Sequence, residues 1–589
     1  MNHTKSAIVR PLLAVVPMIL ARVFSAAGAT IDVTAGDGNA LIQAIEQANS
    51  TPEGDVIRLE AGATYSFPNK PLNAQISGDL VIEGTDTTID NGYGTIARIG
   101  VDSRLTMRRT TVVCRSRAFN LGDDAFAIVG GTMVMEGGSV RACGGAFYIA
   151  GSSTLTLSDV TVEDNRGIWK CGGAVYVDGG TMRVFRSRFL RNIAEGGGLS
   201  PHACESGCSG GAICAKRGSS LFVTDSVFRG NRAHAYSGAS GGAIQVEAGG
   251  TVVIERSEIS SNAVSGGIFA AGGGISSGGD LTLLASTVSG NSVMGAFLAD
   301  ANSHGGGLSL SGNAVLNGVT VAYNTVEQGV GSAFGGGIAA DGIVRAANTI
   351  IARNTAASGP DCGHSTGSGM RSEGHVLVRD PSGCDLIAGE GDVMGRDPVL
   401  GLLDDNGGPT RTHALLSGSP AIDAGSAAAP DVATVCTRQD QRCHARPGGA
   451  RCDVGGFELD GSAEPCDPPT IASCGVRAAT YPSIVCRLEV LEASVAPLER
   501  ATAVRNGFRA ASRRTGRGWE FVLGGQPRRA MPALMGAVRR LRTIDASLRF
   551  GAARRAVPSE TRKALIAENA AIRADLRALR RATRTLGSS

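Results

Sequence analysis

Two successive stretches of the chain decide the fold, because they repeat one pattern over the same length. Residues 210–231 read GGAICAKRGSSLFVTDSVFRGN, and residues 241–262 read GGAIQVEAGGTVVIERSEISSN. Each begins with a glycine pair and ends with an asparagine. Seven such copies lie between Gly144 and Asn354, and their glycine pairs begin 28, 38, 31, 32, 33 and 30 residues apart. A period of this size predicts stacked supersecondary units.

Within each copy, apolar residues alternate with polar ones and a bend interrupts the alternation. In the first copy Leu155 and Leu157 precede the bend, and Val160 and Val162 follow it. Alternation over four to eight residues predicts strands, and no period of 3.6 residues is present. Short strands without helices between the laps predict an all-β fold, a parallel β-helix with coils of about 30 residues stacked about 4.8 Å apart.

The asparagines that close the copies predict a ladder inside one corner of the coils. Their amides can bond to the coils above and below, which satisfies polar groups that burial would otherwise leave without partners. We favour this structural role over a catalytic one. The column consists of Asn165, Asn192, Asn231, Asn262, Asn291, Asn324 and Asn354.

The rest of the chain divides into segments of different pattern. Its 84 glycines, 4% aromatic residues and 19% charged residues suit tight corners and a thin core. The predicted segments are a signal peptide (1–29), an N-terminal strand and capping helix (30–54), the β-helix (55–400), its C-terminal lid (401–460), a Cys- and Pro-containing linker (461–482) and a basic α-helical bundle (483–589).

The first 29 residues have the pattern of a secretory signal. Lys5 and Arg10 precede an apolar run over 12–20, and Ala27-Gly28-Ala29 forms a small-x-small cleavage site. This run is too short to span a membrane, and no later stretch has 18 uninterrupted apolar residues, so we expect no transmembrane helix. In the mature chain, Asp37 or Asn39 can cap a short helix over 40–49 that covers the first coil.

Fourteen cysteines fit an exported protein in an oxidising compartment. Cys143 and Cys171 both directly precede a glycine pair, so stacking predicts a disulfide between them, with Cys114 one further lap away. Cys204, Cys208 and Cys214 cluster near His202, but no convincing zinc ligand set emerges and disulfides are the better interpretation.

Two parts of the chain resemble known families. The pairing of Gly-Gly-Ala-Ile with Phe-x-x-Asn, as at 210–213 and 228–231, is similar to the repeat of the polymorphic outer-membrane proteins of chlamydiae, which are β-helical surface adhesins. The block from Asp397 to Glu458 resembles the C-terminal block of bacterial choice-of-anchor Q proteins. It contains Asp397-Pro398-Val399-Leu400-Gly401, Asp404-Asp405-Asn406-Gly407-Gly408-Pro409-Thr410, Gly418-Ser419-Pro420-Ala421-Ile422-Asp423-Ala424-Gly425 and Cys452-Asp453-Val454-Gly455-Gly456-Phe457-Glu458.

The second resemblance implies an exported, right-handed, single-stranded parallel β-helix of the pectin-lyase-like superfold. It also implies that Cys362 pairs with Cys384 and Cys436 with Cys452. It supplies no catalytic residues. The expected location is therefore secreted or cell-surface, associated with the outer membrane of a bacterium.

The C-terminal segment is basic. Residues 468–589 hold 22 arginines and Lys563 against eight acids, a formal charge of +15, whereas the whole chain carries +3. A basic helical bundle on an acidic rod can contact anionic cell-envelope polymer. Aromatic residues that could stack on bases are few among the arginines, so nucleic acid is not the expected partner. A solvated helical face is the alternative.

The segments between each asparagine and the next glycine pair vary in length and leave the rod at one corner. Binding residues favour loops on a rigid scaffold, so this corner is a candidate binding ridge for a glycan or a protein. Packing of these side chains onto the rod is the alternative interpretation. The candidate residues are Trp169, His202, His234, Tyr236, Phe269, Phe297, His304 and Phe334.

Catalysis is the weaker hypothesis. Gly122-Asp123-Asp124 superficially resembles the acidic motif of polygalacturonases, which would make the protein a glycoside hydrolase or a polysaccharide lyase. The other motifs of that family are absent in order, and hydrolysis needs a suitably spaced carboxylate pair. Asp159, Arg186, Asp225 and Arg256, six residues before their asparagines, alternate in sign and predict an exposed row of weak ion pairs instead.

No cofactor is expected, although calcium is possible in the C-terminal block. Five residues there could gather oxygen ligands, but their spacing matches no known ion loop and turn chemistry explains them as well. They are Asp404, Asp405, Asn406, Asp423 and Asp453.

Overall fold

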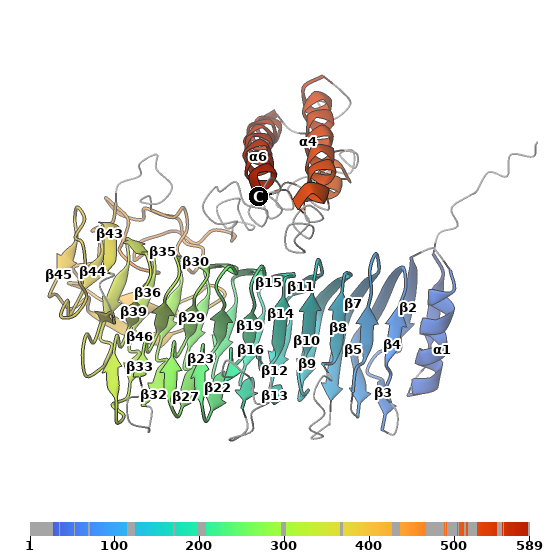
Figure 1. The fold of residues 1–589 in the computed structure, drawn as a ribbon, viewed down its shortest axis with the longest axis horizontal. Helices are drawn as coiled ribbons and strands as arrows, with labels where there is room; N and C mark the ends of the chain where they lie inside the picture. Colours follow the sequence, from blue (N-terminus) through green and yellow to red (C-terminus); the bar gives the residue numbers. More distant parts are fainter. Residues whose placement is uncertain are drawn as a thin grey trace, which may run out of the picture.

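A computed structural model shows a rod made of stacked coils (Figure 1). The described residues are 28–34, 36–51, 54–68, 71–92, 94–114, 124–168, 171–196, 208–295, 302–365, 369–426 and 436–466, followed by 488, 491, 504, 506–511, 514–515, 527–550, 557 and 559–586. Residues 1–27 of the predicted signal peptide lie outside them, as do Asp123, Trp169, His202, Cys204 and Phe297. The predicted parallel β-helix is confirmed, since its strands pair in parallel from lap to lap.

One face of the rod is an 11-stranded parallel sheet that receives one strand from each coil. Its strands are β4 (Ala74–Ile76), β6 (Ala97–Ile99), β8 (Phe126–Val129), β10 (Phe147–Ala150), β14 (Val175–Asp178), β19 (Ile213–Ala215), β24 (Ile244–Val246), β29 (Ile275–Ser277), β34 (Leu308–Leu310), β39 (Ile338–Ala340) and β42 (Cys362–Gly363).

The other two faces belong to a 23-stranded sheet, which bends at a corner so that most coils give it two strands. It begins with β1 (Thr30–Val33), β2 (Asp55–Leu59), β3 (Thr64–Phe67), β5 (Asp79–Asn91), β7 (Arg104–Cys114) and β9 (Thr132–Arg141). Its first arm continues with β11 (Thr154–Ser158), β15 (Thr181–Phe185), β20 (Ser220–Thr224), β25 (Thr251–Glu255), β30 (Asp280–Leu284), β35 (Ala314–Asn317), β40 (Val344–Ala347) and β43 (Met370–Gly374). Its second arm continues with β12 (Thr161–Glu163), β16 (Arg188–Leu190), β21 (Val227–Arg229), β26 (Glu258–Ser260), β31 (Thr287–Ser289), β36 (Thr320–Ala322), β41 (Ile350–Ala352), β44 (Leu377–Val378) and β45 (Val393–Met394).

Two left-handed corners shape each coil around the second arm. The residue six before the asparagine has a positive φ in every copy, as in Asp159 (φ 58°) and Arg186 (φ 43°). The residue directly before the asparagine does so as well, as in Asp164 (φ 55°) and Gly230 (φ 68°). Because a β-branched side chain is strongly disfavoured there, these columns carry Asp, Arg, Ser, Ala, Tyr, Asn or Gly.

The asparagines form a continuous hydrogen-bonded ladder in the interior. Asn231 Nδ2 donates to Asn262 Oδ1 at 2.9 Å and to the Phe189 carbonyl at 2.9 Å. Its own Oδ1 accepts from the backbone N and the Nδ2 of Asn192, both at 3.0 Å. The ladder ends on Asp361, whose Oδ1 accepts from Asn354 Nδ2 at 3.0 Å. Each buried amide therefore satisfies backbone groups of two coils.

A serine row supports the neighbouring corner in the same way. Ser226 Oγ accepts from the Ser187 backbone N at 3.0 Å and donates to the Thr224 carbonyl at 2.7 Å. Ser257 and Ser286 repeat the arrangement one and two coils on.

Close packing between coils requires the second glycine of the pairs at 210–211 and 241–242. A Cβ placed on Gly211 would lie 2.0 Å from the carbonyl oxygen of Gly242, and one on Gly242 would lie 2.0 Å from that of Gly273. No other residue fits at this separation, which explains the glycine signature of the repeat.

Like side chains stack in the core, as the alignment on the asparagines predicts. Phe189 and Phe228 are fully buried and stack with ring centroids 4.8 Å apart. At the N-terminal end, α1 (Gly38–Asn49) packs Leu41 and Ile45 onto the first coil, and Asp37 caps it by accepting from the Asn39 N at 2.8 Å. The predicted capping helix is confirmed (Figure 1).

The C-terminal block, residues 401–460, lies along the rod and not across its open end. Its β46 (Leu400–Asp404) and β47 (Thr412–Leu415) form an antiparallel pair. Arg411 bonds to Glu258 at 2.7 Å, and His413 Nε2 lies 2.8 Å from Ser289 Oγ. The block therefore does not close the end of the rod as a lid would. It covers the outer side of the second arm.

Because the block covers part of the second arm, the predicted row of ion pairs is exposed at one end and buried at the other. Arg186 and Asp159 form an exposed pair at 2.7 Å, as expected. Arg256 pairs with Asp225 at 2.7 Å, but the Arg256 side chain is only 2% exposed. The backbone carbonyl of Arg256 accepts from Thr410 of the C-terminal block at 3.2 Å, which places this end of the row beneath the block.

Five disulfides join ten cysteines in the described part of the chain. Cys114 pairs with Cys143 and Cys171 with Cys214, so the predicted Cys143–Cys171 bond is wrong. Each bond still links stacked coils, but the partner of Cys143 lies in the preceding coil. Cys362–Cys384 and Cys436–Cys452 are present, as the family resemblance implied, and Cys443–Cys466 was not foreseen.

The C-terminal segment is helical, with α4 (Pro527–Phe550) and α6 (Ser559–Leu586) packed against each other. Leu541, Ile544, Leu565, Ile572 and Leu576 are buried in their shared core, together with Phe508. Met535 of α4 lies outside this core and is 43% exposed. Among the described helices, none combines the length and the apolar character needed to cross a membrane.

Candidate functional site

The segments predicted as loops between asparagine and glycine pair are largely paired strands. One six-stranded sheet contains β13 (Arg166–Ile168), β17 (Ile193–Glu195), β22 (Arg232–Ala235), β27 (Ala263–Gly266), β32 (Ser292–Met294) and β37 (Thr325–Val326). A five-stranded sheet contains β18 (Cys208–Ser209), β23 (Gly238–Ser240), β28 (Phe269–Ala271), β33 (Asn302–His304) and β38 (Ser332–Phe334). We call these two sheets the side ridge.

The side ridge has a small core of its own, separate from that of the rod. It is built from short side chains, among them Ala233, Val264, Ala270 and Val293. The two sheets are therefore fixed to one another, and the outward residues of β28, β33 and β38 keep a defined position. In Figure 1 the ridge strands lie along the lower edge of the rod.

Three of the predicted binding residues gather on this ridge. His304 and Phe334 pair directly across β33 and β38, and their rings stack with centroids 5.0 Å apart and an interplanar angle of 14°. Phe269 meets the His304 ring edge-on at 5.5 Å and is 39% exposed. Residues 65 positions apart in the sequence thus form one aromatic surface.

The aromatic surface forms one wall of a pocket of 640 Å³. Polar groups complete the lining, and among the described residues that form it there is no Lys, Arg, Asp or Glu. The pocket is lined by Phe269, Asn302, His304, Gln328, Ser332, Ala333, Phe334, Ala357, Ser358, His364 and Ser365. A concave site with an apolar wall and a few amides and hydroxyls is the usual form of a small-molecule site.

The two histidines of this aromatic pocket differ in their surroundings. Burial lowers the pKa of His304, and the charge of Asp341 opposes that shift only in part. The His304 ring is therefore neutral at pH 7 and offers an aromatic face. His364 Nε2 lies 2.7 Å from the exposed carboxylate of Asp385 at the rim.

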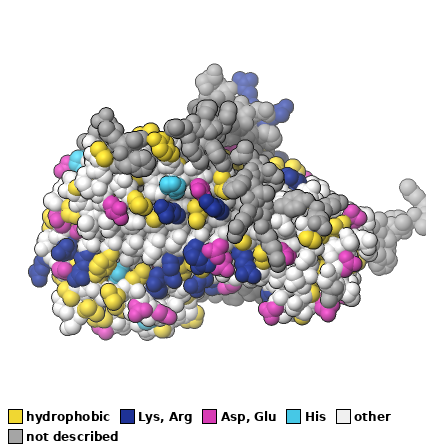
Figure 2. All heavy atoms as spheres, turned by 90° about the horizontal axis from the view of Figure 1, so that it is seen from below, with side chains coloured by type: hydrophobic (Ala, Val, Ile, Leu, Met, Phe, Trp, Pro, Cys, Tyr) yellow, Lys and Arg dark blue, Asp and Glu magenta, His cyan; other side chains and the backbone are white. Residues whose placement is uncertain are grey.

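The other two predicted ridge residues that the structure describes do not join this cluster. His234 Nδ1 lies 2.7 Å from Ser265 Oγ on the six-stranded sheet, and Tyr236 is 43% exposed at the turn before β23. Neither lines the aromatic pocket. Figure 2 views the molecule from below and shows acidic, basic and hydrophobic side chains interspersed over this face.

A second aromatic pair, which the sequence analysis did not single out, lies on the 11-stranded sheet. Tyr148 and Tyr176 pair across β10 and β14, and their rings stack at 5.7 Å. Burial, reinforced by Asp178, Tyr148 and Glu247, raises the pKa of Tyr176 to about 12. The repeated Gly-Gly-Ala-x-Tyr at the start of two copies was the available signal.

Asp124, the described half of the weak catalytic motif, lies near this tyrosine pair. It is buried, and its charge contributes to the raised pKa of Tyr148 after burial and Asp178. The structure thus places the carboxyl group of Asp124 near the two phenol groups of this sheet.

The five residues considered for calcium serve turns. Asp404 and Asp405 accept from nearby backbone nitrogens at 2.8 and 3.0 Å, and Asn406 donates to the Thr412 carbonyl at 2.8 Å. Asp453 Oδ1 accepts from the Asp423 backbone N at 2.8 Å. Elsewhere in the described chain, Asp225 lies close to Cys443 and Cys466, but both sulfurs are committed to one disulfide.

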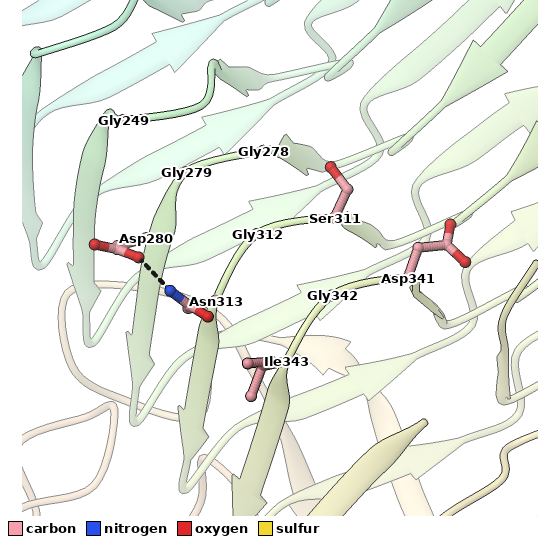
Figure 3. A pocket seen from close by; sticks show the side chains of 10 residues that line it. All are labelled: Gly249, Gly278, Gly279, Asp280, Ser311, Gly312, Asn313, Asp341, Gly342 and Ile343. Atoms are coloured by element: carbon pink, nitrogen blue, oxygen red, sulfur yellow. Dashed lines mark hydrogen bonds between the residues drawn. The ribbon is translucent and has the colours of Figure 1, made fainter. Parts of the chain in front are cut away.

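Another hollow lies at the turns between the 11-stranded sheet and the first arm (Figure 3). It measures 460 Å³, and glycines of four successive coils form half of its lining. Asp280 and Asn313 bond to each other at 2.9 Å, while Ser311 and Asp341 stand on neighbouring turns. It has no aromatic wall, so it suits a sugar ring less well than the ridge pocket does.

Comparison with known proteins supports the fold and leaves the activity open. A family model described as a right-handed beta helix region matches residues 145–356, which span the asparagine ladder and the side ridge. The rod is therefore a right-handed parallel β-helix. Among curated proteins, none matches the chain.

Proposed function

We propose that this protein is an exported rod at the surface of a bacterium, which binds a glycan through the aromatic pocket of its side ridge. The cleavable N-terminal pattern, the cysteine content and the resemblance to choice-of-anchor Q proteins and chlamydial surface adhesins support export. The basic helical segment is proposed to contact anionic cell-envelope polymer. In this proposal the rod is a scaffold, not an enzyme.

The observation that carries the proposal is the stacked pair of His304 and Phe334 beside Phe269. A sugar ring presents a face of C–H groups that packs on an aromatic face and a rim of hydroxyls that needs hydrogen bonds. Asn302, Gln328, Ser332 and Ser358 supply amides and hydroxyls around the aromatic wall.

A direct test is a glycan microarray probed with the wild-type protein and with Phe269→Ala/Phe334→Ala. We expect the double variant to lose signal at least about tenfold, because each ring contributes roughly 1 kcal/mol or more of packing. Ile343→Ala is the matched control, since Ile343 is a 63% exposed apolar residue that does not line the aromatic pocket. Equal signals from all three proteins, or binding only to protein ligands, would refute the glycan proposal.

The second candidate, a polysaccharide lyase or glycoside hydrolase, is favoured by Asp124 and the tyrosine pair of the 11-stranded sheet. Turnover of pectin, alginate or host glycans that is lost in Asp124→Asn and Tyr176→Phe would establish it. Turnover unaffected by both substitutions would point away from this sheet, and absence of turnover agrees with a binding rod.

A further inference from the structure

The helical segment contains a pocket whose lining includes three arginines. The pocket measures 380 Å³ and is lined by Arg514, Pro532, Gly536, Arg539, Arg540 and Thr543. All but Arg514 belong to α4, where spacings of three and four residues place them on one side of the helix. Arg514 reaches the pocket from an earlier helical stretch.

Within the described part of the chain, these three guanidinium groups have no acidic partner. The neighbouring arginines behave differently. Arg549 bonds to Asp545 at 3.2 Å, and Arg573 lies 3.5 Å from the same carboxylate. Arg514, Arg539 and Arg540 are exposed, so three like charges face one shared space without compensation.

Gly536 allows the three cations to converge. A Cβ at this position would lie 2.9 Å from Cδ and 3.0 Å from Nε of Arg514. The flexible end of the Arg514 side chain therefore lies directly over the α4 backbone at Gly536, and a Cβ at this position would displace it. A glycine in the middle of a helix destabilises it relative to alanine, so local helix stability does not explain its presence.

We propose that this pocket binds a tetrahedral oxyanion of the phosphate type. Coulomb repulsion disfavours three cations around one space unless an anion enters. The planar guanidinium fork matches the oxygen spacing of phosphate and forms strong, charge-assisted hydrogen bonds. Thr543 adds a hydroxyl at the rim, although its Oγ1 also donates to the Arg539 carbonyl at 3.2 Å.

Phosphate of this kind is offered by a phosphate-bearing envelope polymer and by a lipid head group. The inference deepens the proposed contact of the helical segment with anionic envelope polymer, and it depends on that proposal for its biological role. Binding of inorganic phosphate tests the pocket alone, whereas binding of poly(glycerol phosphate) or of phosphatidylglycerol vesicles tests which carrier it uses.

The experiment is titration calorimetry of the full mature chain with inorganic phosphate at constant ionic strength. Wild type should bind saturably, and Arg539→Gln/Arg540→Gln should weaken binding by at least about tenfold, because each guanidinium supplies charge-assisted hydrogen bonds. Arg542→Gln/Arg577→Gln removes the same charge from exposed positions of α4 and α6 outside the pocket, and it should change affinity less than about threefold.

Gly536→Ala is an independent test of the pocket, because this variant retains every charge. It should weaken phosphate binding by displacing Arg514, and it should not lower the thermal stability of the helices. If the arginine double variant fails to fold, Gly536→Ala and Arg514→Gln decide the question in its place. Absence of saturable binding, or equal loss in both double variants, would overturn the site. Saturable phosphate binding without binding to either carrier would keep the pocket and overturn the envelope contact.

Discussion

At the scale of single residues, the fold depends on amides that serve two coils at once. Each asparagine of the ladder lies at a place where chain corners leave backbone groups in the interior. A shorter or apolar side chain cannot reach these groups, whereas the amide both donates and accepts. This is why asparagine recurs at every lap while the apolar columns accept Val, Ile, Leu, Met or Phe.

Asn231→Ala should lower the free energy of unfolding by roughly 3 kcal/mol, because it leaves several buried polar groups without partners. The affected groups include the Asn192 backbone N and the Phe189 carbonyl. Urea denaturation measures the change. Asn313→Ala is the control, because its amide bonds to Asp280 at 2.9 Å on the exposed surface and should change stability by no more than about 0.5 kcal/mol. Equal effects of the two substitutions would contradict a structural ladder.

Residue columns were predictable from one sequence because the lap length is nearly constant. The disulfide of Cys143 was not, because its neighbours one lap before and one lap after are equally spaced along the chain. In the structure the cysteine of the preceding coil, Cys114, lies with its Cα 4.6 Å from that of Cys143. Spacing along the chain identifies the possible partners of Cys143, but it does not show whether the bond goes to the preceding or to the following coil.

At the scale of elements, the side ridge is the main feature that the sequence did not predict. Its strands are two to four residues long, and their inward positions carry alanine, valine and serine. Such short, weakly apolar alternation has no distinct strand signal and resembles a loop. Pairing with the same segment of the next coil supplies the hydrogen bonds that each strand lacks by itself.

The position of the C-terminal block could not be predicted from the sequence either, because the residues that it contacts are about 150 positions away. Glu258 is the anchor. Its side chain is buried and pairs with Arg411 at 2.7 Å and with Arg229 at 3.1 Å. Burial by itself would raise the pKa of Glu258, but hydrogen bonds from Arg411, Ser260 and Arg229 outweigh it and the pKa is lowered.

The lowered pKa gives docking of the block a predictable pH dependence. A carboxyl whose pKa is lower in the folded state stabilises that state above its ordinary value of 4.5, and this contribution disappears as the pH falls through the folded-state pKa. Glu258→Gln should therefore cost about 2 kcal/mol at pH 7 and clearly less at pH 3. Denaturation midpoints at the two pH values measure this difference.

The control is Glu83→Gln, which breaks the Arg58–Glu83 pair at 3.0 Å on the outside of the rod. Exposed pairs contribute about 1 kcal/mol or less, so this variant should differ little from wild type at either pH. A Glu258→Gln penalty that stays the same at pH 7 and pH 3 would mean that the ionised carboxylate does not anchor the block.

At the scale of the whole molecule, stacking turns residues far apart in the sequence into continuous surfaces. The binding residues were predicted from the scarcity of aromatics and from the variable corner, and three of them, Phe269, His304 and Phe334, line one pocket. This reasoning could not show that His234 and Tyr236 lie apart from them, because distance along the ridge depends on register. The tyrosine pair was missed for a different reason, since its residues belong to the constant part of each lap.

The central claim is that the side ridge consists of paired strands stacked in register with the rod, so that its aromatic residues hold fixed positions. Hydrogen–deuterium exchange at single-amide resolution tests it most directly. We predict that amides of residues 302–304 and 332–334 exchange slowly, as do those of 308–310 and 338–340 in the 11-stranded sheet. Exchange of the ridge amides at the rate of an unfolded peptide, while the sheet amides stay protected, would contradict the ridge and the binding site built on it.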